Sequence, residues 1–203
     1  MKRSLIVLLV SLMAFSASAS IYFDLPSSNS SGDFNDPALW DKGYVPVDTG
    51  DEIKIGNQTN SVAIVDKVQL DYTTTKITTA NGGHLRIVTG GFIGNGREIK
   101  IGDSGMTSKG FSQSEIGYLD LAGGTLDISG SCKLEIGYKG TGDGRMIVTG
   151  GTMMSSGSDG RIYVGTAGAS GAIGLVKVIG SAASLAVSGD LYVADQGSTS
   201  SAR

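Results

Sequence analysis

Four tyrosines are the residues of this sequence whose type and spacing best suit the binding of a ligand. Tyr118, Tyr138, Tyr163 and Tyr192 each lie in or beside a short apolar segment, so their rings could present an apolar surface and a polar hydroxyl to a sugar. Tyr163 and Tyr192 also share one position of a repeated pattern, which favours packing of these two rings against each other. The sequence therefore supports the hypothesis that the four tyrosines contact carbohydrate.

The acidic residues and the histidine do not form a recognisable catalytic pattern. Hydrolysis of a glycosidic bond needs two carboxylates that converge on a sugar. Here the acidic residues are scattered in alternating positions, such as Asp120, Asp127 and Glu135, and we expect these side chains to face water. His84, the only histidine, follows the Gly82-Gly83 pair without a nucleophile marked by a motif, so we interpret it as a surface turn residue. We predict no catalytic residue.

The sequence also predicts no metal and no other cofactor. One cysteine and one histidine are too few ligands for a tetrahedral zinc site. Asp143 lies in a glycine-rich segment that is similar to calcium-binding turns, but the segment occurs once and its spacing differs, so we interpret Asp143 as a turn residue. Cys132 has the strand parity of Leu134 and Ile136, which predicts a thiol packed inward as a small hydrophobic group.

Short strands in an imperfect repeat are the elements that must position these residues. Four segments align, and their small-residue corners, counted from Gly90, recur at intervals of 33, 27 and 30 residues. The segments are 84–102, 118–137, 145–165 and 175–194. Each contains alternating runs of Ile, Val and Leu bounded by glycine, which is typical of strands. An earlier copy of the last run, at Glu52–Gly56, places the start of the repeat near residue 52.

Stacking of these units predicts an all-β fold, a right-handed parallel β-helix (β-solenoid) with an irregular N-terminal cap. One turn of the chain, here called a rung, cannot cover its own apolar side, so rungs about 4.8 Å apart must share one interior. Leu121, Val148 and Val178 should then lie near one another. Arg86 stands where Met146 is found later, which predicts a bulge or a change of strand parity.

The same alignment predicts that outward side chains form ladders from rung to rung. In the third strand of each unit, the outward position should bring a lysine beside a glutamate and one tyrosine onto another. These positions are Lys100, Glu135, Tyr163 and Tyr192.

The N-terminus and the charge balance predict an exported protein. A basic pair, Lys2-Arg3, precedes an apolar run from Leu5 to Phe15 and the small residues Ala17–Ala19, which together indicate a signal peptide over residues 1–19. The run is too short for a spanning helix, and we expect no permanent membrane segment after cleavage. The mature chain has 14 basic and 19 acidic residues, a charge of −5, which excludes the basic surface of a nucleic-acid-binding protein.

Three parts are therefore predicted: the signal peptide at 1–19, an N-terminal cap segment at 20–51, and β-solenoid repeats at 52–203. The cap segment contains Phe34, Trp40 and all three prolines, unlike the repeats. We expect the repeats to continue beyond Arg203, because open rungs expose unpaired strand edges. The open C-terminal coil would otherwise stack on another chain.

A family resemblance supports this interpretation. The run Leu119–Ile128, followed by Leu134–Gly137, resembles the β-strand repeats of autotransporter passenger regions and related large exported bacterial surface proteins. The opening segment Asp33–Trp40 is similar to the entry segment of many such proteins, although Phe34 stands where Trp is usual. The resemblance covers roughly residues 33–194. It implies a right-handed β-helix at the cell surface or outside the cell, often a stalk or adhesin, without catalytic residues.

We therefore predict a non-catalytic, adhesin-like structural module, extracellular or on the cell surface, with extracellular polysaccharide or cell-surface components as partners. Two alternatives stay open. One is a carbohydrate-binding β-solenoid that uses the four tyrosines, and the other is a β-helix enzyme that processes polysaccharide.

Overall fold

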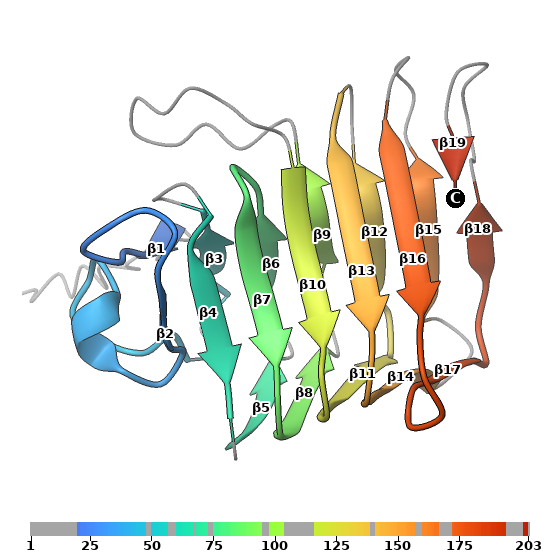
Figure 1. Ribbon diagram of the computed structural model, residues 1–203, viewed down its shortest axis with the longest axis horizontal. Helices are drawn as coiled ribbons and strands as arrows, with labels where there is room; N and C mark the ends of the chain where they lie inside the picture. Colours follow the sequence, from blue (N-terminus) through green and yellow to red (C-terminus); the bar gives the residue numbers. More distant parts are fainter. Residues whose placement is uncertain are drawn as a thin grey trace, which may run out of the picture.

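The structure of the chain is a computed structural model (Figure 1). It describes residues 20–47, 50–56, 60–66, 68–72, 75–94, 98–103, 116–138, 141–156, 160–166, 172–193 and 201–202. In these residues the protein is all-β, with three parallel sheets and a single 3-10 turn, η1 (Pro37–Leu39). The predicted all-β fold of parallel strands is confirmed, and the predicted signal peptide at 1–19 lies outside the described residues.

The three sheets, A, B and C, contain seven, seven and five strands. Sheet A is β1 (Ser20–Phe23), β3 (Glu52–Ile55), β6 (Lys76–Thr79), β9 (Glu98–Asp103), β12 (Lys133–Tyr138), β15 (Arg161–Thr166) and β18 (Leu191–Val193). Sheet B is β2 (Ser31–Asp33), β4 (Val62–Val65), β7 (Gly83–Ile87), β10 (Ile116–Leu121), β13 (Asp143–Val148), β16 (Ile173–Val178) and β19 (Ser201–Ala202). Sheet C is β5 (Val68–Tyr72), β8 (Gly90–Gly94), β11 (Thr125–Ser129), β14 (Thr152–Ser156) and β17 (Ser184–Val187).

From β3 onward the chain visits sheets A, B and C in turn, so one strand of each sheet makes a rung. Each strand pairs in parallel with the strand of the same sheet in the next rung. Leu121 pairs with Val148, which pairs with Val178, as the repeat predicts. The predicted outward ladder in sheet A also has this register. Figure 1 shows the rungs side by side along the long axis, with β1 and β2 at one end and β18 and β19 at the other.

The predicted change of parity at Arg86 is wrong. Leu85 pairs with Leu119, and Arg86 pairs with Asp120 and is exposed on the outer face of sheet B. The expectation came from aligning Gly90 with the first glycine of the next corner. That alignment would pair Gly91 with Gly124, whereas the observed register pairs Gly91 with Thr125, one residue later. With this register the inward and outward positions of β7 match those of β10.

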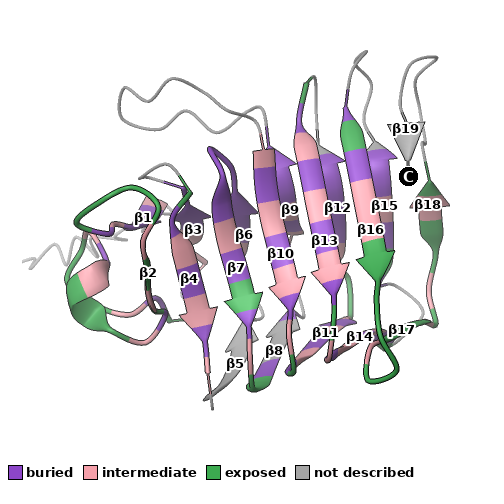
Figure 2. Ribbon diagram, in the orientation of Figure 1, coloured by how far each residue is buried: buried purple, intermediate pink, exposed green. Residues whose placement is uncertain are grey.

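The inward side chains of the sheets form one apolar core. Figure 2 shows buried residues alternating with less buried ones along β10 and β13, as expected for strands with one covered face. Leu119, Leu126 and Leu134, one from each sheet of consecutive strands, are all fully buried. Cys132 is 1% exposed and belongs to this core, which confirms the predicted inward thiol.

An aromatic cluster closes the N-terminal end of the core. The ring of Trp40 packs edge-on against Phe23 and Phe34, with centroids 5.0 and 4.9 Å apart. Its indole Nε1 donates a hydrogen bond to the carbonyl oxygen of Phe34 at 2.8 Å. The sheets themselves begin inside the segment predicted as a cap, because β1 pairs with β3 and β2 pairs with β4.

Sheets A and B meet at a line of glycines, the glycine seam, which consists of Gly83, Gly117, Gly144 and Gly174. A Cβ atom on Gly144 would lie 2.1 Å from the backbone nitrogen of Gly137 and 2.2 Å from the carbonyl oxygen of Ile101. Both atoms belong to sheet A. Only glycine lets the two backbones approach this closely, so one glycine per rung is required at the start of each of these sheet B strands.

We predict that Gly144→Ala lowers the free energy of unfolding by about 3 kcal/mol or more, because backbone must move to admit the methyl group. The matched control is Gly43→Ala. Gly43 has a φ of +71°, and no atom lies within 4 Å of the place that an alanine methyl group would occupy, so only backbone strain of about 1 kcal/mol is expected there. Urea denaturation followed by circular dichroism measures both. An equal decrease in the free energy of unfolding of the two variants would contradict the requirement for glycine at the seam.

Candidate functional site

The structure does not gather the four predicted tyrosines into one row. Tyr118 lies on β10 in sheet B, whereas Tyr163 and Tyr192 lie on β15 and β18 in sheet A. Tyr138 is the last residue of β12, and its side chain lies outside the described residues. A sugar chain could therefore not follow all four rings on one sheet.

Tyr163 and Tyr192 stack on each other, as the ladder predicts. Their ring centroids are 4.8 Å apart and their planes differ by 9°, so the faces are turned along the stack and the edges are turned outward. The hydroxyl of Tyr192 donates to Asp190 at 3.1 Å, and this hydrogen bond raises the pKa of Tyr192. A sugar approaching sheet A from outside would meet ring edges rather than the faces that apolar stacking requires.

Tyr118 is also covered on both faces. His84 stacks on one face, with centroids 4.1 Å apart and planes differing by 16°, and the guanidinium carbon of Arg145 lies 5.7 Å from the ring centroid. His84 is not the predicted turn residue, because the turn ends at Gly82 and β7 begins at Gly83, which places His84 within the strand, in register with Tyr118. Asp143, predicted as a turn residue, begins β13 instead.

A carboxylate lies beside each of the two basic side chains of this stack. Asp143 accepts hydrogen bonds from Nε and Nη2 of Arg145 at 3.0 and 2.7 Å, and these bonds raise the pKa of Arg145. Nδ1 of His84 lies 3.4 Å from Oδ2 of Asp120. The sequence contained the signal for this cluster, since His84, Tyr118 and Arg145 occupy one ladder position, but it becomes visible only with the correct register.

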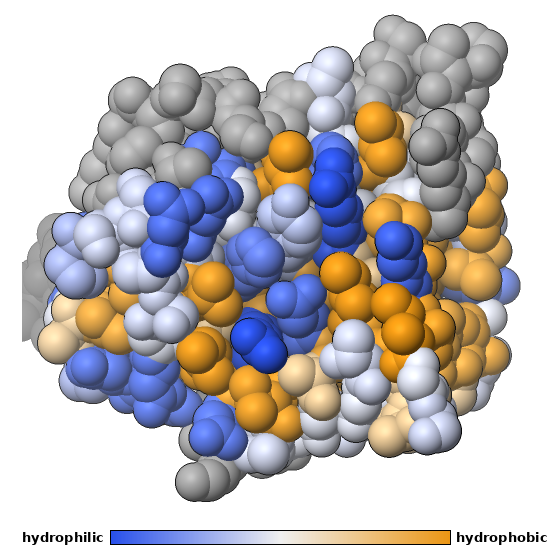
Figure 3. Space-filling view, in the orientation of Figure 1, coloured by the Kyte–Doolittle hydropathy of each residue, from blue (hydrophilic) through white to orange (hydrophobic). Residues whose placement is uncertain are grey.

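A shallow hollow lies beside this stack on the outer face of sheet B. Its volume is about 220 Å³ and it is lined by Arg86, Asp120, Ala122, Ile147 and Thr149. Figure 3 views the protein from the side of sheet B and shows hydrophilic and hydrophobic side chains next to each other over the middle of this face. Arg86 makes no ion pair or hydrogen bond with any described residue. The hollow thus combines a cation, a carboxylate, a hydroxyl and apolar side chains.

Glu135 was predicted to face water, and this is wrong. Its position in the outward ladder is confirmed, but it lies between Lys100 and Tyr163 and is only 7% exposed. Within the described part of the chain its Oε2 has no hydrogen-bond partner. Burial raises the pKa of Glu135 to about 7, although the nearby charge of Lys100 opposes the shift. Asp120 and Asp127 are partly exposed, closer to the expectation.

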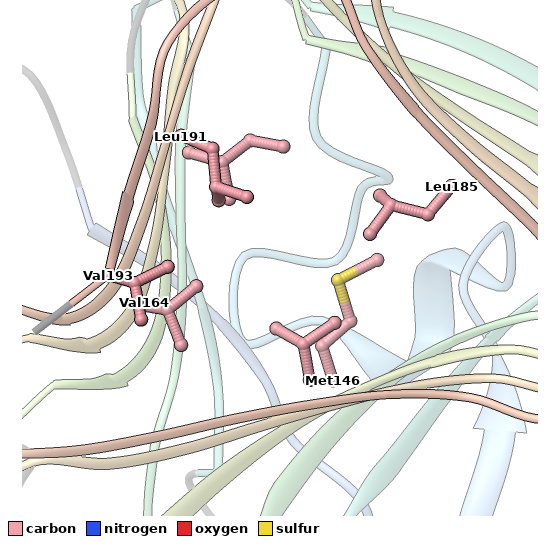
Figure 4. Close-up of a pocket in the computed structure, with 7 residues that line it drawn as sticks. Met146, Val164, Leu185, Leu191 and Val193 are labelled. Atoms are coloured by element: carbon pink, nitrogen blue, oxygen red, sulfur yellow. The ribbon is translucent and has the colours of Figure 1, made fainter. Parts of the chain in front are cut away.

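The C-terminal end of the core forms a second hollow, of about 230 Å³, with an apolar lining (Figure 4). In that view Leu185 and Met146 face Leu191 and Val193 across a common space. Leu191 and Val193 are 49% and 56% exposed, although they pair in register with Ile162 and Val164, which are buried. These are inward positions of a rung that the described residues leave uncovered.

Neither a metal centre nor a spanning helix is found in the described ranges. Among those residues, His, Cys, Asp and Glu nowhere form a group of three or more that could hold a metal ion. None of the helical structure there is long and apolar enough to cross a membrane.

We predict that the free energy of unfolding falls as the pH rises from about 4.5 to about 7, by up to about 3 kcal/mol through Glu135. The folded state binds this proton more tightly than the unfolded chain. The stabilisation is therefore complete below the unfolded pKa and is lost as the pH passes the folded pKa. Glu135→Gln should remove this fall, which denaturant titrations between pH 4 and 8 would measure.

Glu98→Gln is the control for this experiment. Burial favours the protonated form of Glu98, but hydrogen bonds and charges from Lys100 and Lys76 outweigh burial and lower its pKa. Its contribution to stability therefore has the opposite sign and is lost as the pH falls. If the free energy of unfolding of Glu135→Gln changed with pH as it does in the unmodified protein, Glu135 would not be the group that binds the proton.

Comparison of the chain with protein families, with curated proteins and with solved structures found no match. The resemblance to autotransporter passenger regions accordingly stays a prediction from the sequence.

Proposed function

We propose that the chain is a non-catalytic, exported structural module, an adhesin-like spacer whose mature part is a right-handed parallel β-helix. The observation that carries the proposal is the cyclic order of sheets A, B and C with in-register parallel pairing from β3 to β18. Connections between parallel strands of one sheet are almost always right-handed, which supports that hand. Rungs stacked in this way make a stiff body that separates its two ends by a distance set by the number of rungs.

The charged side chains of sheet A support a structural role. Glu52 pairs with Lys54 at 3.3 Å. Glu98 pairs with Lys76 at 3.4 Å and with Lys100 at 2.9 Å. Of these three ion pairs, Glu98–Lys76 joins the neighbouring strands β9 and β6, and opposite charges in such a position favour in-register pairing by roughly 0.2–1 kcal/mol. The other two pairs each lie within one strand, β3 or β9. These carboxylates bind lysines along the stack, and this arrangement differs from the converging pair that a glycosidase requires.

The N-terminal sequence supports export to the cell surface or the medium. The basic pair and apolar run at residues 2–15 have the form of a signal peptide, and a rigid repeat outside the cell would meet extracellular polysaccharide or other cell-surface components. The two alternatives have less support. Tyr192 covers one face of the Tyr163 ring, and His84 and Arg145 cover the two faces of the Tyr118 ring, so these faces are not available to a sugar. For the polysaccharide-processing enzyme, the sheet B hollow offers one carboxylate, Asp120, where a glycosidase needs two.

The open apolar end supports a further part of the proposal. Leu185, Leu191 and Val193 continue inward ladders whose members in the preceding rung are buried. A further rung of the same repeat, with apolar side chains in the same register, is the partner that completes these ladders. Such a rung would remove an apolar surface that exported proteins rarely leave uncovered.

We predict that the exported protein begins at Ser20 and that Leu8→Arg, which interrupts the apolar run, keeps the chain inside the cell. Mass spectrometry of the N-terminus and fractionation of cells and medium measure both outcomes. Leu8→Ile, which keeps the run apolar, is the matched control. A protein that keeps Met1 and stays in the cell would sink the proposed role.

We also predict that the purified protein associates through its open end, where a second molecule can cover the apolar side chains. Val193→Asp should weaken association about tenfold, because a valine buried in the contact contributes about 1.5 kcal/mol. Val47→Asp is the matched control, since Val47 is 57% exposed and Val193 is 56% exposed. Light scattering over a concentration series measures the mass. Equal effects of the two substitutions would contradict end-on stacking.

A further inference from the structure

The hollow on sheet B contains a positively charged side chain, Arg86, that forms no ion pair with any residue that the structure describes. Arg86 is exposed at its edge and pairs in register with Asp120, but the carboxylate of Asp120 lies beside His84 instead. Arg145, in the neighbouring ladder, shows the contrast, because Asp143 holds it through two hydrogen bonds. The guanidinium of Arg86 therefore keeps its donors for a ligand. A guanidinium presents a planar fork of donors that matches a carboxylate.

The rest of the lining suits a small polyhydroxylated ring. Ile147 and Ala122 supply apolar surface, and Asp120 supplies oxygens that accept hydrogen bonds from hydroxyl groups. The hydroxyl of Thr149 donates to the carbonyl oxygen of Leu121 at 3.3 Å, so its own oxygen can still accept a hydrogen bond. A volume of about 220 Å³ is below the roughly 300–1,000 Å³ of pockets for drug-sized ligands, which points to one sugar unit.

The charges select among anionic ligands. A phosphate monoester carries a charge of about −1.5 to −2 at pH 7 and would place more negative charge near the carboxylate of Asp120 than a carboxylate ligand does. A neutral sugar would leave Arg86 without a partner. A ligand with one carboxylate and several hydroxyls uses both groups, with the carboxylate on Arg86 and the hydroxyls on Asp120. Lys177, exposed on the next strand and in register with Ile147, adds positive potential beyond the hollow.

We propose that this hollow binds an acidic sugar, a uronic acid unit of an extracellular polysaccharide. Arg86 binds the carboxylate, Asp120 accepts hydrogen bonds from ring hydroxyls, and Ile147 packs against the apolar face of the ring. The site lies on sheet B and does not use the four tyrosines. It deepens the proposed surface role by naming the partner, and it rests on that role only for the source of the sugar.

The test uses the purified protein and two matched probes, a trimer of galacturonic acid and a trimer of galactose, in calorimetric titrations at low and physiological salt. We expect the acidic trimer to bind and the neutral one to bind at least tenfold more weakly, with affinity falling as salt screens Arg86. Arg86→Gln should weaken binding of the acidic trimer about tenfold. Arg161→Gln, an exposed arginine on sheet A, should leave the affinity within about twofold, which controls for overall charge.

Several outcomes would overturn the proposal: no binding of the acidic trimer, equal binding of the neutral trimer, or full affinity in Arg86→Gln with an unchanged circular dichroism spectrum. If the Tyr192→Ala variant lost binding of the acidic trimer while the Arg86→Gln variant bound it with full affinity, the site would lie at the tyrosine pair, and this result would also overturn the proposal. Failure here leaves the spacer role standing, because export and end-on association are measured separately.

Discussion

The close approach of sheets A and B at the glycine seam is the constraint on which the rest of the structure depends. A side chain at Gly144 would collide with backbone of Gly137 and Ile101, and glycine recurs at this position in the four strands β7, β10, β13 and β16. In these strands the glycine fixes the register of sheet B against sheet A. Because side chains alternate along a strand, it also decides which residues point inward. A slip of one residue would send Leu119 and Leu121 outward and bring Asp120 into the core.

The same register decides the chemistry of the outer faces. Each outward side chain lies between two others from rungs that are distant in sequence, so its neighbours determine its charge state and its freedom. Glu135 is buried because Lys100 and Tyr163 flank it on either side. Arg86 keeps its donors because His84 lies closer to the carboxylate of Asp120. Outward side chains that bind their neighbours in adjacent rungs have few groups left to bind a ligand. Arg86 is an exception, and it lines the candidate site.

The repeat made the core predictable and left the site largely unpredictable. Periodic Leu, Ile and Val residues, such as Leu121 and Val148, predict inward positions because burial demands them in every rung. Residue spacing between equivalent positions is uneven, with 34 residues from Leu85 to Leu119 and 27 from Leu119 to Met146. An alignment that starts from one glycine corner can therefore be off by a residue, as happened at Arg86. Each outward contact depends on the register between neighbouring rungs, so a shift of one residue in the alignment assigns the wrong neighbours to every outward side chain.

The two ends of the stack differ in a way that gives the protein a direction. At the N-terminal end the rings of Trp40 and Phe34 pack edge-on over the interior, and the indole N–H of Trp40 donates a hydrogen bond to the carbonyl oxygen of Phe34. At the other end the inward positions Leu191 and Val193 are exposed among the described residues, although their partners in the preceding rung are buried. If the proposed end-on stacking takes place, it would therefore use this end, because the aromatic rings already cover the other one. The outer face of sheet B would then keep one orientation relative to the direction of stacking.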